Sequence, residues 1–375
     1  MKILLISHSF FPTVSARANR TFELAKEFSR QGNKVDIVIP SNNYDYEHME
    51  DEYKFKIIKI GKINSITTSK SYAKRKPRKV LNAVKRSIRY IIGGEWYILY
   101  FVKDILSLKE KIDRDYDLAI SIGLPFSTHI GYYLLHKKVK FSKVSIADYG
   151  DPYSYNKTIK KPSIYKIIEK HVSNYFDFIT IPTEKAKPCY KFIKNDKKIK
   201  IIPQGFEIKD YSNLYKKNSI PTFAFAGNFY KDIRNPIKFF NALKDIDREY
   251  KLVLYANLKD LNQIEFIEYA KDVLKDKVEV NHFLDREDCI IELSKMDFLI
   301  NILNLTDTQV PSKLIDYTIS GRPILNIIPD KINIEEIKMF LNSKYDYSNS
   351  VNLMEFNIKN VAEKFVRLVE EKETI

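Results

Sequence analysis

Short apolar segments alternate with longer amphipathic segments along most of the chain, and this alternation constrains the fold more than any other feature. A short apolar run is typical of a buried strand, whereas apolar residues spaced three and four apart are typical of a helix. Alternating strands and helices predict a parallel sheet covered by helices on both faces. In the first half, strands are predicted at 3–6, 35–39, 55–60, 118–121, 144–147 and 178–181, and helices at about 17–31, 127–138, 163–174 and 184–193.

A second series of the same kind begins after the sequence IIPQG at 201–205. The polar stretch 203–221 is interpreted as an interdomain connection. Two domains also agree with the length of 375 residues, which exceeds one typical core. The predicted domains cover 1–202 and 222–354, and a helix within 355–375 is expected to pack back on the first domain. Strands of the second domain are predicted at 222–226, 252–256, 278–280, 298–302 and 323–327.

The net charge of +15 is concentrated in one part of the sequence. Residues 53–94, called the basic segment here, contain thirteen lysines and arginines and no aspartate or glutamate. The rest of the chain is therefore nearly neutral. Such a concentration of positive charge indicates an anionic partner, such as nucleic acid, anionic lipid or a phosphorylated substrate.

Within the basic segment, Val80, Val84 and Ile88 recur at helical spacing, and the aromatic run WYILYFV follows at 96–102. A basic amphipathic helix beside aromatic side chains is typical of docking on an anionic membrane surface. A solvated basic face followed by an ordinary buried helix is the alternative. The membrane interpretation predicts contacts from Lys74, Arg75, Lys79, Arg86, Arg89 and Trp96.

Several functional classes lack their sequence signatures. Two cysteines cannot form a disulfide framework or a four-thiolate zinc site. The motifs of zinc proteases, serine hydrolases and common nucleic-acid-binding domains are absent, so neither a metal nor a nucleic acid is expected. The first residues are interpreted as a strand and not a signal peptide, and no apolar run reaches the roughly 20 residues of a membrane span. We therefore expect a cytoplasmic protein, peripheral at the inner face of the membrane.

Two loops that follow predicted strands offer anion-binding groups, although no glycine-rich phosphate motif is present. The loop 227–236 (GNFYKDIRNP) contains Asn228 and Arg234, and an arginine can bind a diphosphate through paired hydrogen bonds. In the second loop, Pro311 leads into a predicted helix. Its first turn carries Ser312 and Lys313, and its free N–H groups favour an anion. A solvated arginine and an ordinary helix cap are the alternatives.

Asp316, one turn into that helix, is placed to accept hydrogen bonds from a ribose diol. In the first domain, Asp148 and Asp151 directly follow a predicted strand, with Gly150 between them. Two acids in such a loop fit a ligand site, and a capped turn is the alternative. Arg17 and Arg20 lie near the start of the first predicted helix.

These segments together resemble the retaining glycosyltransferases of family 4. The resemblance covers nearly the whole chain and is carried by KILLISHSFFPTVSARANRTFELAKEFSRQGNKVDIVIP, IADYGDP, KIKIIPQGFE, FAFAGNFYKDIRNP and VPSKLIDYTISGRPIL. It implies the GT-B fold, in which two Rossmann-like, doubly wound parallel-sheet domains face a cleft. It is strongest to transferases of bacterial surface-polysaccharide assembly.

The resemblance also implies site residues, with departures from the family pattern. The family's two glutamates fall on Thr308 and Asp316, its arginine after the first strand of the second domain falls on Asn228, and its following lysine falls on Arg234. Its cleft histidine matches Asp148. The predicted catalytic residues are Asp148, Arg234 and Lys313. The predicted donor-binding residues are Ser15, Ala16, Asn228, Arg234, Leu284, Thr308, Pro311, Ser312, Lys313 and Asp316, and Arg17, Arg20 and Asp151 are assigned to the acceptor or the membrane.

By this resemblance, the protein transfers a hexosyl or acetamidosugar group from a nucleotide sugar, with retention, to a lipid-linked or membrane-associated glycan. No metal or other cofactor is expected, because Arg234, Lys313 and a helix N-terminus could stabilise the leaving diphosphate. The alternatives are a transferase with a soluble acceptor, a nucleotide-sugar epimerase, a non-catalytic partner of a transferase and a nucleic-acid-binding protein.

Overall fold

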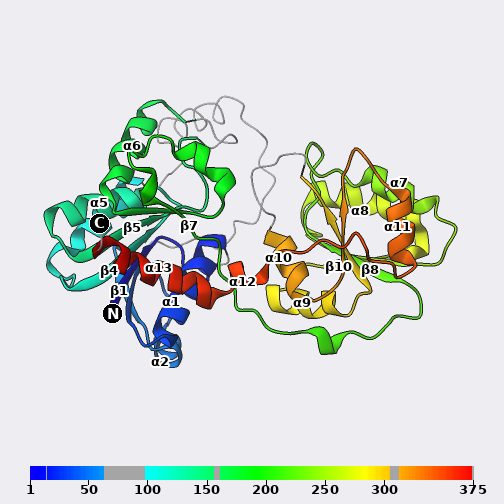
Figure 1. Ribbon diagram of the computed structural model, residues 1–375, viewed down its shortest axis with the longest axis horizontal. Coiled ribbons are helices and arrows are strands. Elements are labelled where there is room, and N and C mark those ends of the chain that lie inside the picture. Colours follow the sequence, from blue (N-terminus) through cyan, green and yellow to red (C-terminus); the bar gives the residue numbers. More distant parts are fainter. Residues whose placement is uncertain (14, 63–97, 156–160, 305–311, 374–375) are drawn as a thin grey trace. The chain divides into compact units, whose positions relative to one another are not determined.

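The computed structural model describes residues 1–13, 15–62, 98–155, 161–304 and 312–373 (Figure 1). Most of the basic segment therefore lies outside the described residues, including Lys74, Arg75, Lys79, Arg86 and Arg89. The predictions for Trp96, Thr308 and Pro311 also lie outside them. The chain divides into two compact units: unit 1 comprises 1–207 and 355–375, and unit 2 comprises 208–354.

Unit 1 contains a parallel sheet of seven strands in the order β3-β2-β1-β4-β5-β6-β7. Residues in the central strands are almost fully buried, which explains why these strands are rich in apolar residues. The order reverses between β1 and β4, as in a doubly wound fold. The strands are β1 (Lys2–Ser7), β2 (Lys34–Pro40), β3 (Lys56–Ile60), β4 (Tyr116–Ile122), β5 (Ser142–Asp148), β6 (Phe178–Ile181) and β7 (Ile199–Ile201).

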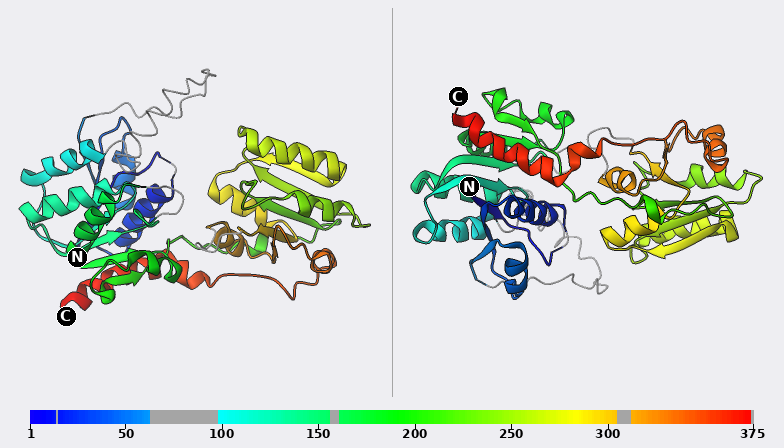
Figure 2. Two further views of the ribbon diagram at one scale, coloured as in Figure 1. Left: turned by 90° about the horizontal axis from the view of Figure 1, so that it is seen from above. Right: turned by 60° about the horizontal axis from the view of Figure 1, so that its bottom comes forward.

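Helices cover both faces of this sheet. They are α1 (Ala16–Arg30), α2 (Glu47–Tyr53), α4 (Ile98–Leu106), α5 (Ser127–Lys138), α6 (Ile164–Tyr175) and α13 (Ile358–Glu373). The C-terminal helix α13 lies along α1 and also contacts β4 and β5 (Figures 1 and 2). Its apolar stripe, which includes Val361 and Phe365, belongs to the same core as Leu24 and Phe28 of α1.

Gly205 allows the chain to pass closely under α13. A Cβ atom at this position would collide with the Ile358 side chain. Next to it, Phe206 donates its N–H to the Phe356 carbonyl (2.8 Å) and accepts a hydrogen bond from the Ile358 N–H (2.9 Å). These bonds join the segment that leaves the seven-stranded sheet to the segment that returns to it.

Unit 2 contains a parallel sheet of five strands in the order β10-β9-β8-β11-β12, and this order reverses between β8 and β11. The strands are β8 (Thr222–Ala226), β9 (Lys251–Ala256), β10 (Val278–His282), β11 (Phe298–Ile302) and β12 (Ile324–Ile327). The helices are α7 (Ile237–Lys244), α8 (Leu261–Leu274), α9 (Arg286–Ser294), α10 (Ser312–Ile319), α11 (Ile334–Leu341) and the short α12 (Leu353–Phe356), which crosses the boundary of the two units.

The predicted fold class is confirmed, because both units are Rossmann-like domains with parallel sheets. In unit 1, α2, α4 and β7 lie outside the predicted strand and helix ranges, although a buried helix after the basic face was given as an alternative. The helix predicted at 184–193 is instead a 3₁₀ segment, Glu184–Tyr190, that contains Pro188. Proline lacks the N–H that an α-helix requires, which explains this difference. No helix among the described residues is long and apolar enough to cross a membrane.

Candidate functional site

Ligands of open parallel sheets bind beyond the carboxyl ends of the strands, where the strand order reverses. In unit 2 this place lies between the loop after β8 and the loop after β11. Arg234 comes from the first loop and Asn304 from the second. The Arg234 Nε–H donates to Asn304 Oδ1 (3.0 Å), so one hydrogen bond spans the reversal point of the sheet.

The Arg234 guanidinium is only partly exposed. Its Nη1 lies 3.5 Å from the Asn228 carbonyl oxygen. Burial lowers the pKa of Arg234 from its ordinary value, while Tyr317 and Tyr230 act in the opposite direction. A cation that is held in place and partly desolvated attracts a phosphate more strongly than a fully hydrated one. The predicted pair of Asn228 and Arg234 is thus brought together beside the strand end.

Helix α10 is fixed against the end of β8 by Tyr317. This buried phenol accepts a hydrogen bond from the Ala226 N–H (2.7 Å) and donates one to the Ala226 carbonyl (3.2 Å). Earlier on the same helix, the carboxylate of Asp316 is nearly buried. Asp316 Oδ1 accepts a hydrogen bond from Arg286 Nε (2.8 Å) and forms an ion pair with Arg286 Nη2 (2.7 Å). Lys313 Nζ lies 3.6 Å from Asp316 Oδ2.

Asp316 is therefore engaged by two cations of unit 2. Arg286, the first residue of α9, was not predicted as a site residue. Its position directly after Asp285, between a predicted strand and the helix that follows, is the sequence feature that could have identified it. A ribose bound by Asp316 would have to share this carboxylate with Arg286. The assigned role of Asp316 in donor binding remains a prediction.

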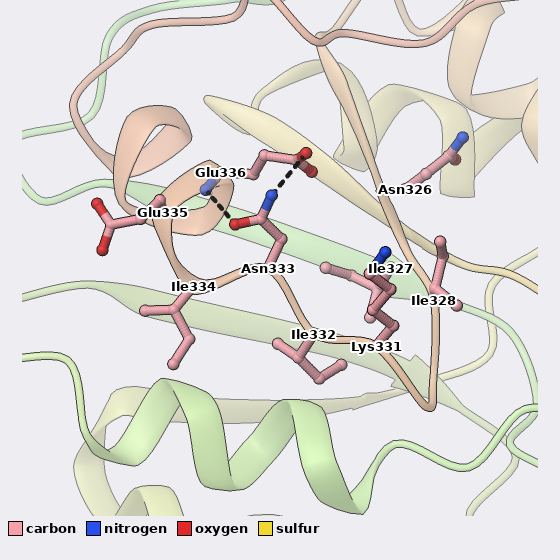
Figure 3. Close-up of a pocket in the computed structure, with 9 residues that line it drawn as sticks. All are labelled: Asn326, Ile327, Ile328, Lys331, Ile332, Asn333, Ile334, Glu335 and Glu336. Atoms are coloured by element: carbon pink, nitrogen blue, oxygen red, sulfur yellow. Dashed lines mark hydrogen bonds between the residues drawn. The ribbon is translucent and has the colours of Figure 1, made fainter.

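A cavity of about 410 Å³ opens at the carboxyl end of β12, beside the start of α11 (Figure 3). Isoleucines form much of its wall, together with Asn326, Lys331 and Glu335. Asn333 caps α11 by accepting from the Glu336 N–H (3.4 Å) and donating to Glu336 Oε1 (2.9 Å). The cavity has the size of a small-molecule site. The sequence analysis did not predict it.

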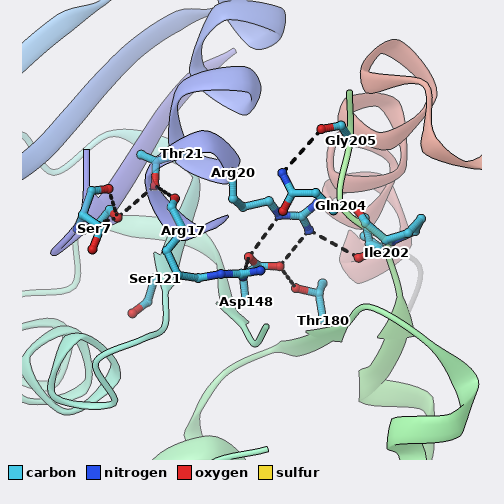
Figure 4. Close-up of polar contacts among 12 residues, drawn as sticks. Ser7, Arg17, Arg20, Thr21, Ser121, Asp148, Thr180, Ile202, Gln204 and Gly205 are labelled. Atoms are coloured by element: carbon cyan, nitrogen blue, oxygen red, sulfur yellow. Dashed lines mark hydrogen bonds and ion pairs between the residues drawn. The ribbon is translucent and has the colours of Figure 1, made fainter. Parts of the chain in front are cut away.

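In unit 1, Asp148 ends β5 and is 1% exposed. Arg20 donates two hydrogen bonds to this carboxylate, from Nη2 to Oδ1 (2.9 Å) and from Nε to Oδ2 (3.2 Å). Thr180 Oγ1 donates a third hydrogen bond, to Oδ1 (2.7 Å). Figure 4 shows this network converging from α1, β5 and β6. Burial raises the pKa of Asp148, but the two nearby arginines and the hydroxyl outweigh burial and lower it.

Arg20 is also buried, and it donates to the carbonyl oxygens of Ile202 (3.3 Å) and Pro203. The guanidinium N–H groups of Arg20 thus make their hydrogen bonds to atoms of unit 1. This arrangement gives Arg20 and Asp148 a structural role. The predicted acceptor or membrane role of Arg20 and the catalytic role of Asp148 remain predictions that these contacts do not support.

Arg17 is more accessible than Arg20 and lies over Gly150. A Cβ atom at Gly150 would collide with the Arg17 guanidinium, so glycine makes this approach possible. Arg17 Nη1 is 3.6 Å from Asp148 Oδ2, and Asp151 also contributes favourable electrostatics. Burial nevertheless lowers the pKa of Arg17. Arg17, Gly150 and Asp151 therefore form a polar, partly exposed group at the carboxyl ends of the unit 1 strands.

His129 lies beside this group and was missed by the sequence analysis, because nothing distinguishes it from the other histidines in the sequence. It is almost fully buried, and its Nδ1 is 2.8 Å from Ser121 Oγ. His129 also lines a cavity of about 10 Å³, together with Leu124, Tyr149 and Asp151. Burial lowers the pKa of His129 to about 3, so the imidazole stays neutral.

This burial predicts a loss of stability in mild acid. The unfolded chain takes up a proton at His129 below about pH 6.5, whereas the folded protein does not until about pH 3. Over that range the free energy of unfolding should fall with decreasing pH by up to about 1.4 kcal/mol per pH unit from this residue. Urea unfolding of His129→Asn should show a shallower pH dependence. The control His48→Asn, at an exposed position, should keep the pH dependence of the wild type. If the free energy of unfolding changes with pH equally steeply in His129→Asn and the wild type, the prediction is wrong.

The remaining predicted residues occupy separate places. Ser15 caps α1 by accepting from the Ala18 N–H (3.1 Å), and Ala16 is the exposed first residue of that helix. Leu284 is exposed in the loop after β10. Ser312 begins α10. Among the described residues, no group of three or more histidine, cysteine, aspartate or glutamate side chains is arranged to hold a metal ion.

No protein-family model matches this chain. A comparison with curated proteins likewise gives no significant match.

Solved structures do match, over nearly the full length. A glycosyltransferase from Rickettsia africae has 13% sequence identity and a TM-score of 0.64, with 99% of this chain and 98% of that chain covered. The lipopolysaccharide outer core galactosyltransferase WaaB, in its apo form, has 12% identity and a TM-score of 0.60, with coverage of 99% and 100%. A putative UDP-N-acetylglucosamine 2-epimerase from Listeria monocytogenes has 13% identity and a TM-score of 0.54, with coverage of 99% and 96%. At these identities the likeness concerns the fold.

Proposed function

We propose that this protein is a glycosyltransferase that moves a sugar from a nucleotide-sugar donor to a lipid-linked or membrane-associated glycan. One observation carries the proposal: Arg234 is partly buried and anchored by Asn304 where the strand order of unit 2 reverses. A cation held at this point suits a nucleoside diphosphate. Glycosyltransferases are among the solved structures that share the fold.

The proposed chemistry requires stabilisation of a departing diphosphate. As the glycosidic bond to the donor breaks, negative charge develops on the phosphate oxygens. Arg234, Lys313 and the N–H groups at the start of α10 would offset this charge without a metal ion. Their positions are fixed before the reaction by Asn304 and Tyr317, and pre-organised charges of this kind are the most effective.

In unit 1, the partly exposed group of Arg17, Gly150 and Asp151 is the proposed acceptor side. It lies at the carboxyl ends of the strands, where a ligand of a parallel sheet is expected. Asp151 could accept a hydrogen bond from a sugar hydroxyl, and Arg17 could bind a phosphate of a lipid carrier. We further propose that the protein acts at the cytoplasmic face of the membrane, in surface-polysaccharide synthesis.

Membership of glycosyltransferase family 4 and retention of the anomeric configuration rest on the sequence resemblance. The departures at Thr308 and Asn228 concern residues that contact the donor in that family. We propose that Arg234 compensates for the arginine that Asn228 replaces. The transferred group is proposed to be a hexose or an acetamidosugar, and its identity should follow from the donor screen described next.

The proposal predicts that one class of nucleotide sugar raises the melting temperature. UDP-, GDP-, ADP- and CMP-sugars should be compared by thermal shift, because a ligand at 100 times its Kd stabilises a protein by about 2.7 kcal/mol. Arg234→Ala should lose the shift, whereas Lys231→Ala, an exposed change in the same loop, should keep it. If no nucleotide or nucleotide sugar stabilises the wild-type protein, the proposed donor site is wrong.

The likeness to a putative epimerase favours one alternative activity on the same kind of substrate. The two activities differ in their need for an acceptor. An epimerase converts a nucleotide sugar in the absence of any acceptor, and NMR of the sugar would detect the product. A transferase leaves the sugar configuration of the free donor unchanged.

A further inference from the structure

Helix α6 exposes an unusual set of side chains for a surface helix. Ile164 is 54% exposed and Ile167 is 65% exposed, although both are large apolar residues. Lys166 and Lys170 are exposed as well; Lys170 lies three residues after Ile167 and four after Lys166, so these side chains share one side of the helix. The opposite side is buried through Tyr165 and Val172. The exposed face is therefore apolar and cationic together.

No acidic residue of α6 reduces this positive charge at the surface. Its one acidic residue, Glu169, is 1% exposed and accepts a hydrogen bond from the Ser154 N–H (2.9 Å). Burial raises the pKa of Glu169, which further disfavours its negative charge. The face of α6 thus presents lysines without competing carboxylates from its own helix.

The exposed face continues onto neighbouring segments. Tyr155, which is 41% exposed, stacks on Phe192 with ring centroids 5.7 Å apart, and Lys166 Nζ lies 5.1 Å above the Tyr155 ring. Asn174 of α6 binds the segment after Phe192 by accepting from the Lys194 N–H (2.9 Å). We call Tyr155, Ile164, Lys166, Ile167, Lys170, Phe192 and Lys194 the α6 surface.

The fold places this surface near the proposed acceptor side. In a parallel sheet, the helix that follows a strand starts at the strand's carboxyl end. Ile164 and Ile167 are in the first turns of α6, and the loop before them begins with Asp148 at the end of β5. In the same loop, Lys161 Nζ donates to the Tyr153 carbonyl (2.8 Å). The α6 surface therefore adjoins the strand ends that carry Gly150 and Asp151.

We propose that the α6 surface docks on an anionic lipid membrane. The isoleucines and Tyr155 would enter the boundary between headgroups and acyl chains, and the lysines would contact the headgroups. This inference deepens the proposed function. It rests on that function in one respect: docking would bring the enzyme to a lipid-linked acceptor. It is independent of the basic segment, because every residue of the α6 surface is a described residue outside 53–94.

Charge favours a membrane over a second copy of this chain. A symmetric dimer formed through the α6 surface would bring this cationic patch against a second copy of itself. Such like charges repel. An anionic bilayer instead pairs the lysines with phosphates while burying the isoleucines.

Fluorescence quenching tests contact at a single position. Trp96 is the only tryptophan, so Trp96→Phe with Ile167→Trp reports on the α6 surface. Trp96→Phe with Leu261→Trp is the control, because Leu261 is 81% exposed on α8 of unit 2. With vesicles of brominated phosphatidylcholine and phosphatidylglycerol, emission from position 167 should be quenched and blue-shifted, and emission from position 261 should not. Equal behaviour at both positions, or equal quenching by vesicles without phosphatidylglycerol, would overturn the proposal.

Vesicle flotation of matched variants tests the strength of docking. The test variant combines Ile164→Ser, Ile167→Ser, Lys166→Glu and Lys170→Glu. The control combines Leu261→Ser, Met354→Ser, Lys244→Glu and Lys259→Glu, all at exposed positions of unit 2. Affinity for phosphatidylglycerol vesicles should fall by about tenfold or more in the test variant only. Circular dichroism and thermal unfolding confirm that both variants are folded.

Two further outcomes would overturn the proposal. One is unchanged flotation of the test variant. The other is a wild-type dimer in sedimentation that the two isoleucine changes alone convert to monomer. The nucleotide-sugar thermal shift separates this proposal from the proposed function, because the test variant should keep that shift. If nucleotide sugars give the thermal shift but the wild-type protein does not bind vesicles, only the membrane-docking proposal is wrong. If the protein binds vesicles but no nucleotide sugar gives a thermal shift, only the proposed donor site is wrong.

Discussion

Arg234→Ala should lower the rate of sugar transfer about 10²–10³-fold, the usual cost of removing one pre-organised donor to a developing negative charge. The loss should appear in both KM and kcat, because Arg234 binds the diphosphate of the donor and the negative charge on that diphosphate grows as the donor bond breaks. Arg234 makes its hydrogen bonds at the edge of unit 2 and is only partly buried, so unfolding should change little. Release of nucleoside diphosphate, followed with the donor that the thermal screen identifies, measures the effect.

Two further variants show whether Arg234 acts directly. Lys231→Ala removes an exposed cation of the same loop that pairs with Glu265 (2.8 Å). An exposed ion pair contributes little to stability, and Lys231 has no proposed contact with the donor, so this variant should keep a rate close to that of the wild type. Asn304→Ala frees the Arg234 guanidinium without removing it and should give an intermediate loss. Wild-type turnover by Arg234→Ala would refute both the role of this residue and the proposed donor site.

Asp148→Ala should destabilise the protein by about 3–5 kcal/mol, because it leaves the buried Arg20 without a counter-ion. Arg20 is 2% exposed, and Asp148 supplies two of its hydrogen bonds. Chemical denaturation would show the change as a lower midpoint. The control is Asp115→Ala, which breaks the ion pair between Lys2 and an exposed carboxylate and should cost at most about 1 kcal/mol.

A double variant identifies the cause of that loss. Arg20→Met with Asp148→Leu removes both charges and should recover part of the stability, since buried ion pairs are often replaceable by apolar side chains.

The pH dependence of the stability that Asp148 contributes has a defined sign. The folded pKa of Asp148 is lowered, so its stabilisation is present above about pH 4 and is lost as the pH falls through the folded pKa. Asp148→Ala should lack this acid-dependent component.

The central strands of both sheets were predicted because nearly all of their residues are buried. Segments such as Leu118–Ile122 and Phe298–Ile302 are mostly apolar, as expected of strands that are buried on both faces. Helix α2 was missed because none of its residues is buried, so it has no apolar periodicity. Strand β7 was missed because it has three residues and lies at the sheet edge.

The loops that form the candidate site were predicted for a related reason. Each follows a predicted strand, and parallel strands bring their carboxyl ends together. The side-chain pairs within these loops were not predicted. Arg20 and Asp148 are 128 residues apart, and Arg234 and Asn304 are 70 residues apart. Such pairs depend on the register of neighbouring strands and on rotamers, and local sequence patterns determine neither.

The return of α13 to unit 1 sets an order for folding during synthesis. The residues of unit 2 lie between the two segments of unit 1, so unit 2 can be complete on the ribosome while unit 1 is not. Until 358–373 emerge, the parts of α1, β4 and β5 that α13 contacts stay uncovered. The half that is translated first therefore becomes native last, and in the meantime it is the part most in need of a chaperone.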